Sequence, residues 1–132
     1  MIVLDASVVV ELLLNRPSAV RLARRLRDPD EAFHAPHLID LEIAQTLRCY
    51  QAIGVMSPQR ARQALLAFAQ MPIERHPQWP FLRRIWELRH NLTAYDAAYV
   101  ALAEVLDAPL LTCDRALASA PGHRATFELI EG

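Results

Sequence analysis

Short apolar runs that fit buried strands alternate along this chain with segments of helical pattern. The first run, Ile2-Val3-Leu4, is apolar throughout, which is typical of a central strand covered on both faces. The five predicted strands are residues 2–4, 32–35, 72–76, 110–112 and 126–130. Such short strands cannot bury themselves and need helices against them.

Helical spacing and capping residues predict the segments between these strands. Ser57-Pro58 supplies an N-cap and a first-turn proline, and Gly54 ends the preceding helix. The predicted helices are residues 7–14, 18–27, 37–53, 58–70, 79–90 and 94–106, with a short one from Arg115. Alternating strands and helices imply the α/β class, with a parallel sheet of four to five strands covered on both faces. A length of 132 residues suits a single domain over residues 1–132.

The composition indicates where in the cell the protein is located, and it argues against one type of metal site. No apolar run approaches the roughly 18 residues of a membrane span, and the start lacks the features of a secretory signal. We therefore expect a cytoplasmic protein without membrane contact. Cys49 and Cys113 lie far apart and are expected to be free thiols. The five His are scattered and no C-x-x-C occurs, so a zinc site is not expected.

All 14 basic residues are Arg, against 15 acidic residues and a net charge of −1. A biased genome composition is the simpler explanation for the missing Lys. Arg is nonetheless the better bidentate partner for phosphate. If four carboxylates are withdrawn into a metal site, the remaining surface is positive and admits a polyanion.

Two carboxylates follow predicted strands directly. Asp5 ends the first strand and Asp114 ends the fourth. Burying a lone carboxylate is costly, and ligand sites of open parallel sheets lie beyond the carboxyl ends of the strands. Each residue could instead cap the helix that follows it. If the two strands are neighbours, Asp5 and Asp114 meet at one edge of the sheet.

Two further carboxylates share a helix face with apolar residues. Glu42 follows Leu38 and Ile39 at helical spacing, and Asp96 is followed by apolar residues three and four positions later. A surface position is the ordinary alternative for Glu42. For Asp96 the alternative is a capping box with Thr93. A cap and a metal site can coexist at that position.

Taken together, the four acids predict a metal site. Clustered carboxylates raise one another's pKa unless a cation neutralises them. Oxygen ligands without a His or Cys cluster favour Mg²⁺ or Mn²⁺. Such sites commonly serve phosphate chemistry. The blander alternative is an α/β domain whose acids are all caps.

Four motifs in order also carry a resemblance to a known family. They are Val3-Leu4-Asp5-Ala6-Ser7, the segment from Ala35-Pro36-His37-Leu38 to Glu42, the run from Tyr95-Asp96 to Ala103, and Thr112-Cys113-Asp114. Over essentially its whole length the chain resembles PIN-domain ribonucleases, specifically the VapC-type toxins of type II toxin–antitoxin systems. The resemblance implies a three-layer α/β/α sandwich. It also implies that Asp5, Glu42, Asp96 and Asp114 are catalytic and metal-ligand positions, with Ser7 and Thr112 as supporting hydroxyls.

The resemblance implies a Mg²⁺- or Mn²⁺-dependent endoribonuclease that leaves 5′-phosphate and 3′-hydroxyl ends, with Asp5 or Asp96 helping to deprotonate the water. It implies a cognate antitoxin laid along the helices at 7–14, 18–27 and 37–70, and a homodimer. Apart from the resemblance, Arg16, Arg24, Arg25 and Arg115 are candidates to contact RNA phosphates, and an ordinary solvent-exposed face is the alternative for all four. Trp79, Phe81 and Trp86 are candidate anchors of an interface, but helical spacing favours core packing for them. Some family members carry a further acid after the fourth motif, but residues 115–120 contain none.

Two rival functions remain open at this point. A Mg²⁺-dependent phosphatase of the haloacid-dehalogenase type would use Asp5 as its nucleophile. Such enzymes usually have a second Asp two residues later, where this chain has Ser7. A non-catalytic module that binds RNA or protein on the same fold is the other rival, although the presence of all four acids argues against it.

Overall fold

A computed structural model describes residues 1–131 of this chain. Within them the strands are β1 (Ile2–Leu4), β2 (Phe33–Pro36), β3 (Ile73–His76), β4 (Leu110–Thr112) and β5 (Phe127–Leu129). They form one sheet in the order β3-β2-β1-β4-β5, and every pairing is parallel. The prediction of a parallel sheet is confirmed, and each strand lies within one residue of its predicted bounds.

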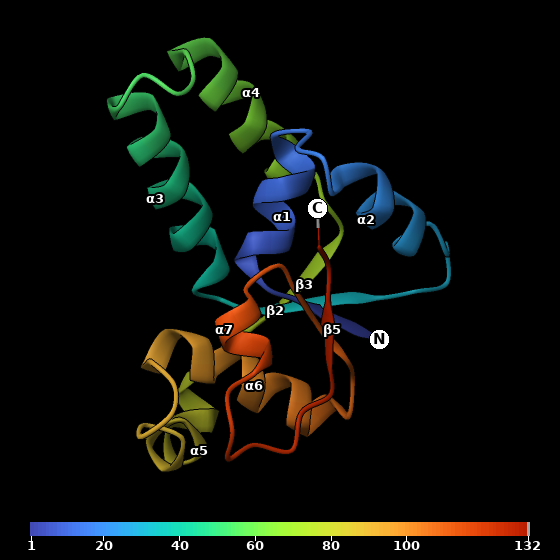
Figure 1. The fold of residues 1–132 in the computed structure, drawn as a ribbon, viewed down its shortest axis with the longest axis vertical. Helices are drawn as coiled ribbons and strands as arrows, with labels where there is room; N and C mark the ends of the chain where they lie inside the picture. Colours follow the sequence, from blue (N-terminus) through green and yellow to red (C-terminus); the bar gives the residue numbers. More distant parts are fainter. Residues whose placement is uncertain (132) are drawn as a thin grey trace.

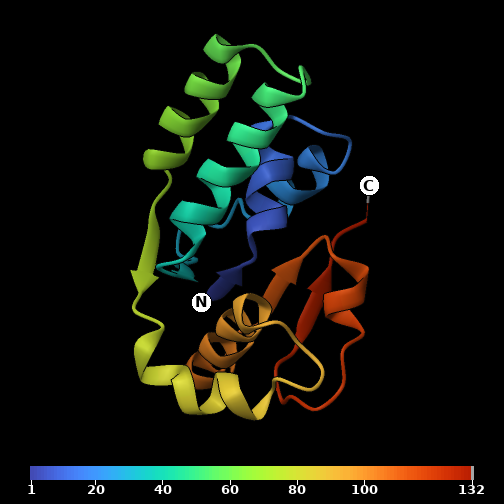
Figure 2. The same ribbon diagram turned by 90° about the vertical axis from the view of Figure 1, so that its left-hand side faces the viewer.

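Helices cover both faces of this sheet, as Figures 1 and 2 show. The helices are α1 (Ala6–Leu13), α2 (Ala19–Arg25), α3 (Ile39–Ala52), α4 (Pro58–Ala69), α5 (Leu82–Glu87), α6 (Ala94–Leu106) and α7 (Arg115–Ala118). In Figure 2, α1 to α4 lie on one side of the strands, and α5 and α6 lie on the other. The three-layer α/β/α sandwich is therefore confirmed.

The central strand β1 is fully buried because helices pack against both of its faces. Ile2, Val3 and Leu4 have no exposed surface. On one face α6 packs against β1 and β2, and every residue from Ala97 to Ala103 of that helix is buried. Each fully buried Val or Leu side chain stabilises the fold by roughly 1.5–3 kcal/mol. This burial holds the carboxyl end of β1 in a rigid frame.

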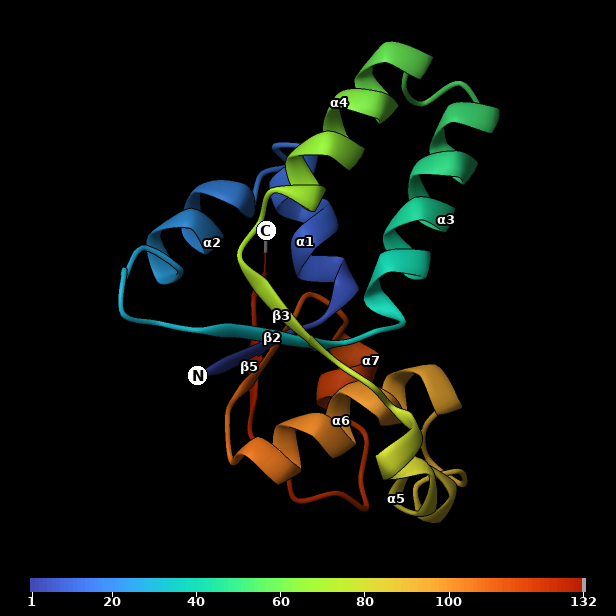
Figure 3. The ribbon, with the colours of Figure 1, turned by 180° about the vertical axis from the view of Figure 1, so that it is seen from behind.

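Helices α3 and α4 form a hairpin that extends away from the sheet, as the view from behind shows (Figure 3). Gly54 has a positive φ of 78° just after α3, a conformation that favours glycine. The Ser57 side chain accepts a hydrogen bond from the Arg60 amide and begins α4. Both ends of this connection match the prediction.

The helix predicted over residues 79–90 is shorter than expected. It consists of a 3₁₀ turn, η1 (Trp79–Phe81), followed by the six residues of α5. Phe81 packs against the core, but Trp79 and Trp86 are 73% and 67% exposed, so their predicted core packing is wrong. Trp86 follows the buried Ile85 and so lies off the buried face, with the Arg89 guanidinium over its ring.

Two other expectations concern the cysteines and the membrane. Cys49 and Cys113 are both free thiols, as predicted. Among residues 1–131, no helix combines the length and the apolar character that crossing a bilayer requires.

Candidate active site

Asp5 and Asp114 lie at the carboxyl ends of neighbouring strands. Strands β1 and β4 pair directly, and the Asp5 amide donates to the Leu111 carbonyl at 3.0 Å. The strand order reverses here, because the chain passes from β1 to β2 on one side and places β4 on the other. Such a reversal opens a crevice at the carboxyl ends of the strands. The predicted meeting of Asp5 and Asp114 at one sheet edge is confirmed.

Two hydroxyls hold the carboxylate of Asp5, which is only 7% exposed. Ser7 Oγ and Thr112 Oγ1 each donate to its Oδ2 at 2.7 Å. The Ser7 hydroxyl also accepts from the Cys113 amide, and the Thr112 hydroxyl accepts from the Asp114 amide, both at 3.0 Å. The two hydroxyls therefore tie the first motif to the fourth around one carboxylate.

Glu42 and Asp96 reach the same region from helices on opposite faces of the sheet. The Tyr99 hydroxyl of α6 donates to Oε1 of Glu42 in α3 at 2.6 Å. Thr93 Oγ1 accepts from the Asp96 amide at 3.1 Å, so Thr93 caps α6 as predicted. Both Glu42 and Asp96 still line the cavity described below, so the cap and the site coexist at Asp96.

The capping interpretation of Asp114 also holds. Its Oδ1 accepts from the amides of Ala116 and Leu117 at 2.9 and 3.2 Å, which begins α7. The residue is exposed to solvent and lines the cavity as well. One carboxylate oxygen therefore caps a helix while the same side chain borders the site.

All four predicted acids line one cavity of about 330 Å³. Its full lining is Asp5, Ala6, Ser7, Val10, Glu11, Arg16, Glu42, Thr46, Tyr50, Asp96 and Asp114. The acids come from segments up to 109 positions apart in the sequence. The fold thus gathers at one place the carboxylates that sequence reasoning had selected separately.

Burial and mutual repulsion perturb the carboxylates of this cavity. Burial raises the pKa of Asp5 most strongly, with the Asp114 charge adding to it and the Ser7 and Thr112 hydroxyls opposing it. Burial also raises the pKa of Glu42 and of Asp96, and the Asp5 charge adds to both shifts. A cation among these oxygens would relieve both the repulsion and the lost hydration. The donor set, which is all oxygen, fits Mg²⁺ or Mn²⁺.

Sequence reasoning missed Glu11 as a residue of this cavity. Its Oε2 accepts from Ser18 Oγ at 2.5 Å, and its Oε1 lies 3.6 Å from Nη1 of Arg16. One signal was available in the sequence. Glu11 lies four positions after Ser7, on the same face of a helix whose other residues are apolar.

The four arginines proposed for RNA phosphates are placed differently from one another. Arg16 lines the cavity, with its guanidinium 5.2 Å from the centre of the Tyr50 ring. Arg24 is exposed on α2. Arg25 forms two 2.8 Å hydrogen bonds to Glu128, and Arg115 is paired with Glu131. Arg16 alone of the four borders the acids.

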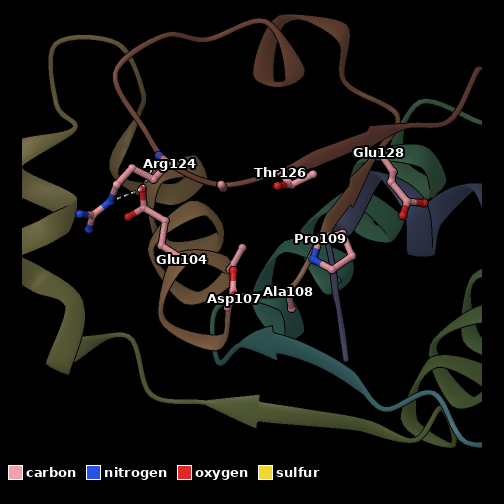
Figure 4. A pocket seen from close by; sticks show the side chains of 9 residues that line it. Glu104, Asp107, Ala108, Pro109, Arg124, Thr126 and Glu128 are labelled. Atoms are coloured by element: carbon pink, nitrogen blue, oxygen red, sulfur yellow. Dashed lines mark hydrogen bonds and ion pairs between the residues drawn. The ribbon is translucent and has the colours of Figure 1, made fainter.

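A larger cavity of about 540 Å³ lies at the other end of the sheet, beside the residues that precede β4 and β5 (Figure 4). Three acids line it, Glu104, Asp107 and Glu128, and Glu104 accepts two hydrogen bonds from Arg84, at 2.8 and 2.9 Å. The Arg124 amide donates to the same carboxylate at 2.6 Å. These contacts lower the pKa of Glu104, Arg84 most of all. This acid is thus neutralised by the protein itself, unlike those at the ends of β1 and β4.

A family model for the PIN domain matches residues 2–122. The chain belongs to the PIN-domain family. Two Mycobacterium tuberculosis relatives named Ribonuclease VapC12 and Ribonuclease VapC1 are 43% and 40% identical to it. The alignments cover 98% and 97% of this chain and 99% and 96% of the relatives. The resemblance to VapC-type PIN domains is therefore confirmed.

Solved PIN structures agree with the fold at low sequence identity. VapBC2 from Rickettsia felis, bound to a DNA fragment from its promoter, has a TM-score of 0.70 at 14% identity and covers 99% of this chain and 100% of its own. Mycobacterium tuberculosis VapC20, described as a toxin that cleaves the sarcin–ricin loop, has a TM-score of 0.67 at 12% identity. It covers 90% of this chain and 94% of its own.

Proposed function

We propose that this PIN-domain protein is a Mg²⁺- or Mn²⁺-dependent endoribonuclease and the toxin of a toxin–antitoxin pair. The observation that carries the proposal is the convergence of Asp5, Glu42, Asp96 and Asp114 on one cavity at the carboxyl ends of β1 and β4. Relatives that align over nearly the whole chain bear the name ribonuclease, which supports the same activity.

The four carboxylates are the residues that would hold the metal. Ser7 and Thr112 fix the Asp5 carboxylate, and Tyr99 fixes that of Glu42, so two of the ligands are oriented before an ion arrives. When bound, a divalent ion at such a site lowers the pKa of a water and neutralises charge on a phosphate. The protein contributes the rigid frame that holds these carboxylates in place.

Asp96 is the better candidate to accept the proton of the attacking water. Oδ2 of Asp5 already accepts two hydroxyl hydrogen bonds, whereas Asp96 is half-buried in the lining of the cavity. The oxygen of that water bonds to phosphorus as the bond from phosphorus to the 3′ oxygen breaks. The departing 3′ oxygen takes up a proton from solvent, which leaves a 5′-phosphate and a 3′-hydroxyl.

A hollow beside the acidic cavity offers a place for an RNA base. Its volume is about 320 Å³, and it is lined by Leu41, Glu42, Gln45, Thr46 and Tyr95. Glu42 and Thr46 belong to both hollows, so the two are contiguous. Tyr95 is 66% exposed. Unpaired bases stack on such rings, so single-stranded RNA is the favoured substrate, with Arg16 holding a flanking phosphate.

Exposed apolar residues support the proposed protein partners. An apolar groove of about 230 Å³ lies between α3 and α4, within the surface assigned to the antitoxin. On the opposite layer, the exposed Trp79, Leu82 and Trp86 are available for a homodimer. Burying such side chains is the usual use of an apolar surface patch. We further propose that the pair assembles in the cytoplasm.

End-group analysis tests this activity against its rivals. Protein freed of antitoxin is incubated with RNA from its native host and Mg²⁺ or Mn²⁺, and new ends are mapped. We expect fragments with 5′-phosphate and 3′-hydroxyl ends that disappear with EDTA. RNA binding without cleavage would favour the binding module. An aspartyl-phosphate at Asp5, trapped by a metal fluoride, would favour the phosphatase.

A further inference from the structure

A second group of metal-binding side chains lies on the outer strands, apart from the acidic cavity. His34 is on β2, and Glu74 and His76 are on β3. The register places His34 opposite Glu74, and residues two apart on a strand share a face. One ligand atom from each of the three side chains lies within 4.8 Å of the others. The scattered positions of these residues in the sequence had argued against such a site.

The separations of these atoms suit a tetrahedral metal. His34 Nδ1 lies 2.8 Å from His76 Nε2 and 3.5 Å from Glu74 Oε2. Ligands about 2.0–2.1 Å from a tetrahedral zinc ion lie about 3.4 Å from one another. The His34–Glu74 distance already has that value. The two imidazoles need to separate by only about half an ångström to admit the ion.

The environment of His34 favours a metal cation in place of the proton between His34 Nδ1 and His76 Nε2. His34 is 5% exposed, and its Nε2 is buried without a hydrogen-bond partner among residues 1–131. The Arg75 side chain does not compete, because it pairs with Asp40 and lies over the Phe68 ring.

The site is also open to an arriving ion. The Glu74 side chain is 68% exposed, so an ion can enter and water can complete its coordination. Two imidazoles and one carboxylate select Zn²⁺ over Mg²⁺, which prefers oxygen ligands alone. Because His34 Nε2 has no hydrogen-bond partner within residues 1–131 to orient the ring, we expect weaker affinity than in sites with a supported His ligand.

We propose that His34, Glu74 and His76 bind one Zn²⁺ ion, with water as the fourth ligand, and that this ion fastens the edge strand β3 to β2. An edge strand has one unpaired side and gains most from such a cross-link. The proposal does not depend on the nuclease activity. It gives the protein a zinc site that is chemically distinct from the carboxylate site.

Zinc titration by calorimetry tests the proposal, using the full chain with Asp5→Asn and Asp96→Asn to weaken the carboxylate cavity. We expect one Zn²⁺ per chain, undisturbed by millimolar Mg²⁺, and visible Co²⁺ absorption typical of four-coordination. Adding His76→Gln should weaken zinc binding at least about 100-fold. Adding His90→Gln, which changes an exposed histidine outside this group, should leave zinc binding unchanged. Circular dichroism confirms that each variant is folded. No zinc binding by the folded protein, or equal binding after His76→Gln, would overturn the proposal.

Discussion

The Tyr99 hydroxyl donates a 2.6 Å hydrogen bond to Oε1 of Glu42, which joins α6 to α3 across the edge of the acidic cavity. Tyr99 itself is fully buried, and burial followed by the Glu42 charge raises the pKa of its hydroxyl above the usual range. The tyrosine therefore stays protonated and remains a donor. Burial and the charges of Asp5 and Asp96 raise the pKa of Glu42, and the hydrogen bond from Tyr99 lowers it. This bond therefore favours the charged form of the Glu42 carboxylate.

Replacing Tyr99 with Phe should make Glu42 harder to ionise. Hydrogen bonds to charged groups contribute roughly 1.5–3 kcal/mol, which corresponds to a pKa change on the order of one unit. We expect the acidic limb of the cleavage rate to move to higher pH by about that amount. The measurement is the pH dependence of cleavage at saturating Mg²⁺.

The control for this variant is a double-mutant cycle. In a Glu42→Gln background the carboxylate is gone, so Tyr99→Phe should cause no further shift of the acidic limb. An equal shift in both backgrounds would show that Tyr99 acts through packing and not through Glu42.

Without metal, the acidic cavity should destabilise the fold as pH rises. The folded-state pKa values of Asp5, Glu42 and Asp96 are raised, so the native state holds more protons than the unfolded state above about pH 4. The free energy of unfolding therefore falls as the pH rises from about 4 to the raised pKa values of these three acids, and it stays lower above them. We expect Asp96→Asn in EDTA at pH 7.5 to melt at a higher temperature than the wild type.

Adding Mg²⁺ should make the wild type melt at a higher temperature than Asp96→Asn. At 100 times its dissociation constant a ligand stabilises the native state by about 2.7 kcal/mol, which raises the melting temperature by roughly 5–15 °C. Asp96→Asn should gain much less. Asp40→Asn, an exposed acid two positions before Glu42, should respond to Mg²⁺ as the wild type does. A lower melting temperature for Asp96→Asn in EDTA would contradict the predicted repulsion.

Tyr95 should affect RNA binding more than the chemical step. Base–aromatic stacking contributes roughly 1–3 kcal/mol, so Tyr95→Ala should raise KM about 5–100-fold and change kcat little. Tyr95→Phe keeps the ring and should retain most of the affinity. Steady-state cleavage of a single-stranded RNA separates the two parameters. A loss in kcat alone would place Tyr95 in a different role.

Arg16 should account for one phosphate contact. Its guanidinium lies beside the acids, whereas Arg83 is 96% exposed on α5 in the other layer. Arg16→Gln should weaken RNA binding and reduce the slope of log affinity against log salt concentration by about one. Arg83→Gln should leave that slope unchanged. Equal salt-dependence slopes for the two variants would show that Arg16 does not contact an RNA phosphate.

The positions of the acids were predictable because each one departs from its local pattern. Asp5 and Asp114 follow apolar strands, and parallel strands bring their carboxyl ends to one edge. Glu42 and Asp96 interrupt apolar helix faces. Because burying a carboxylate is costly, an acid at a position where an apolar residue is expected indicates a functional site, whereas an ordinary surface acid does not.

The features that the sequence did not predict depend on strand register and on tertiary contacts. Tyr99 looks like one more core residue until the fold brings Glu42 to its hydroxyl. His34 and His76 are 42 positions apart and meet only through the register of β2 and β3. Trp86 is exposed because it follows the buried Ile85 within α5 and so lies off the buried face, and only the packing of α5 shows which face that is.

Cleavage of host RNA by Asp96→Asn and Asp40→Asn is the most direct measurement of the central claim. Both variants change one aspartate to its amide, but only Asp96 lines the acidic cavity, while Asp40 is paired with Arg75 on the surface. We expect Asp96→Asn to lose at least about 100-fold in Mg²⁺-dependent rate, in the range of general-base catalysis. Asp40→Asn should stay within about twofold of the wild type, since surface changes have small effects. Equal cleavage by both folded variants would contradict a carboxylate-centred nuclease site.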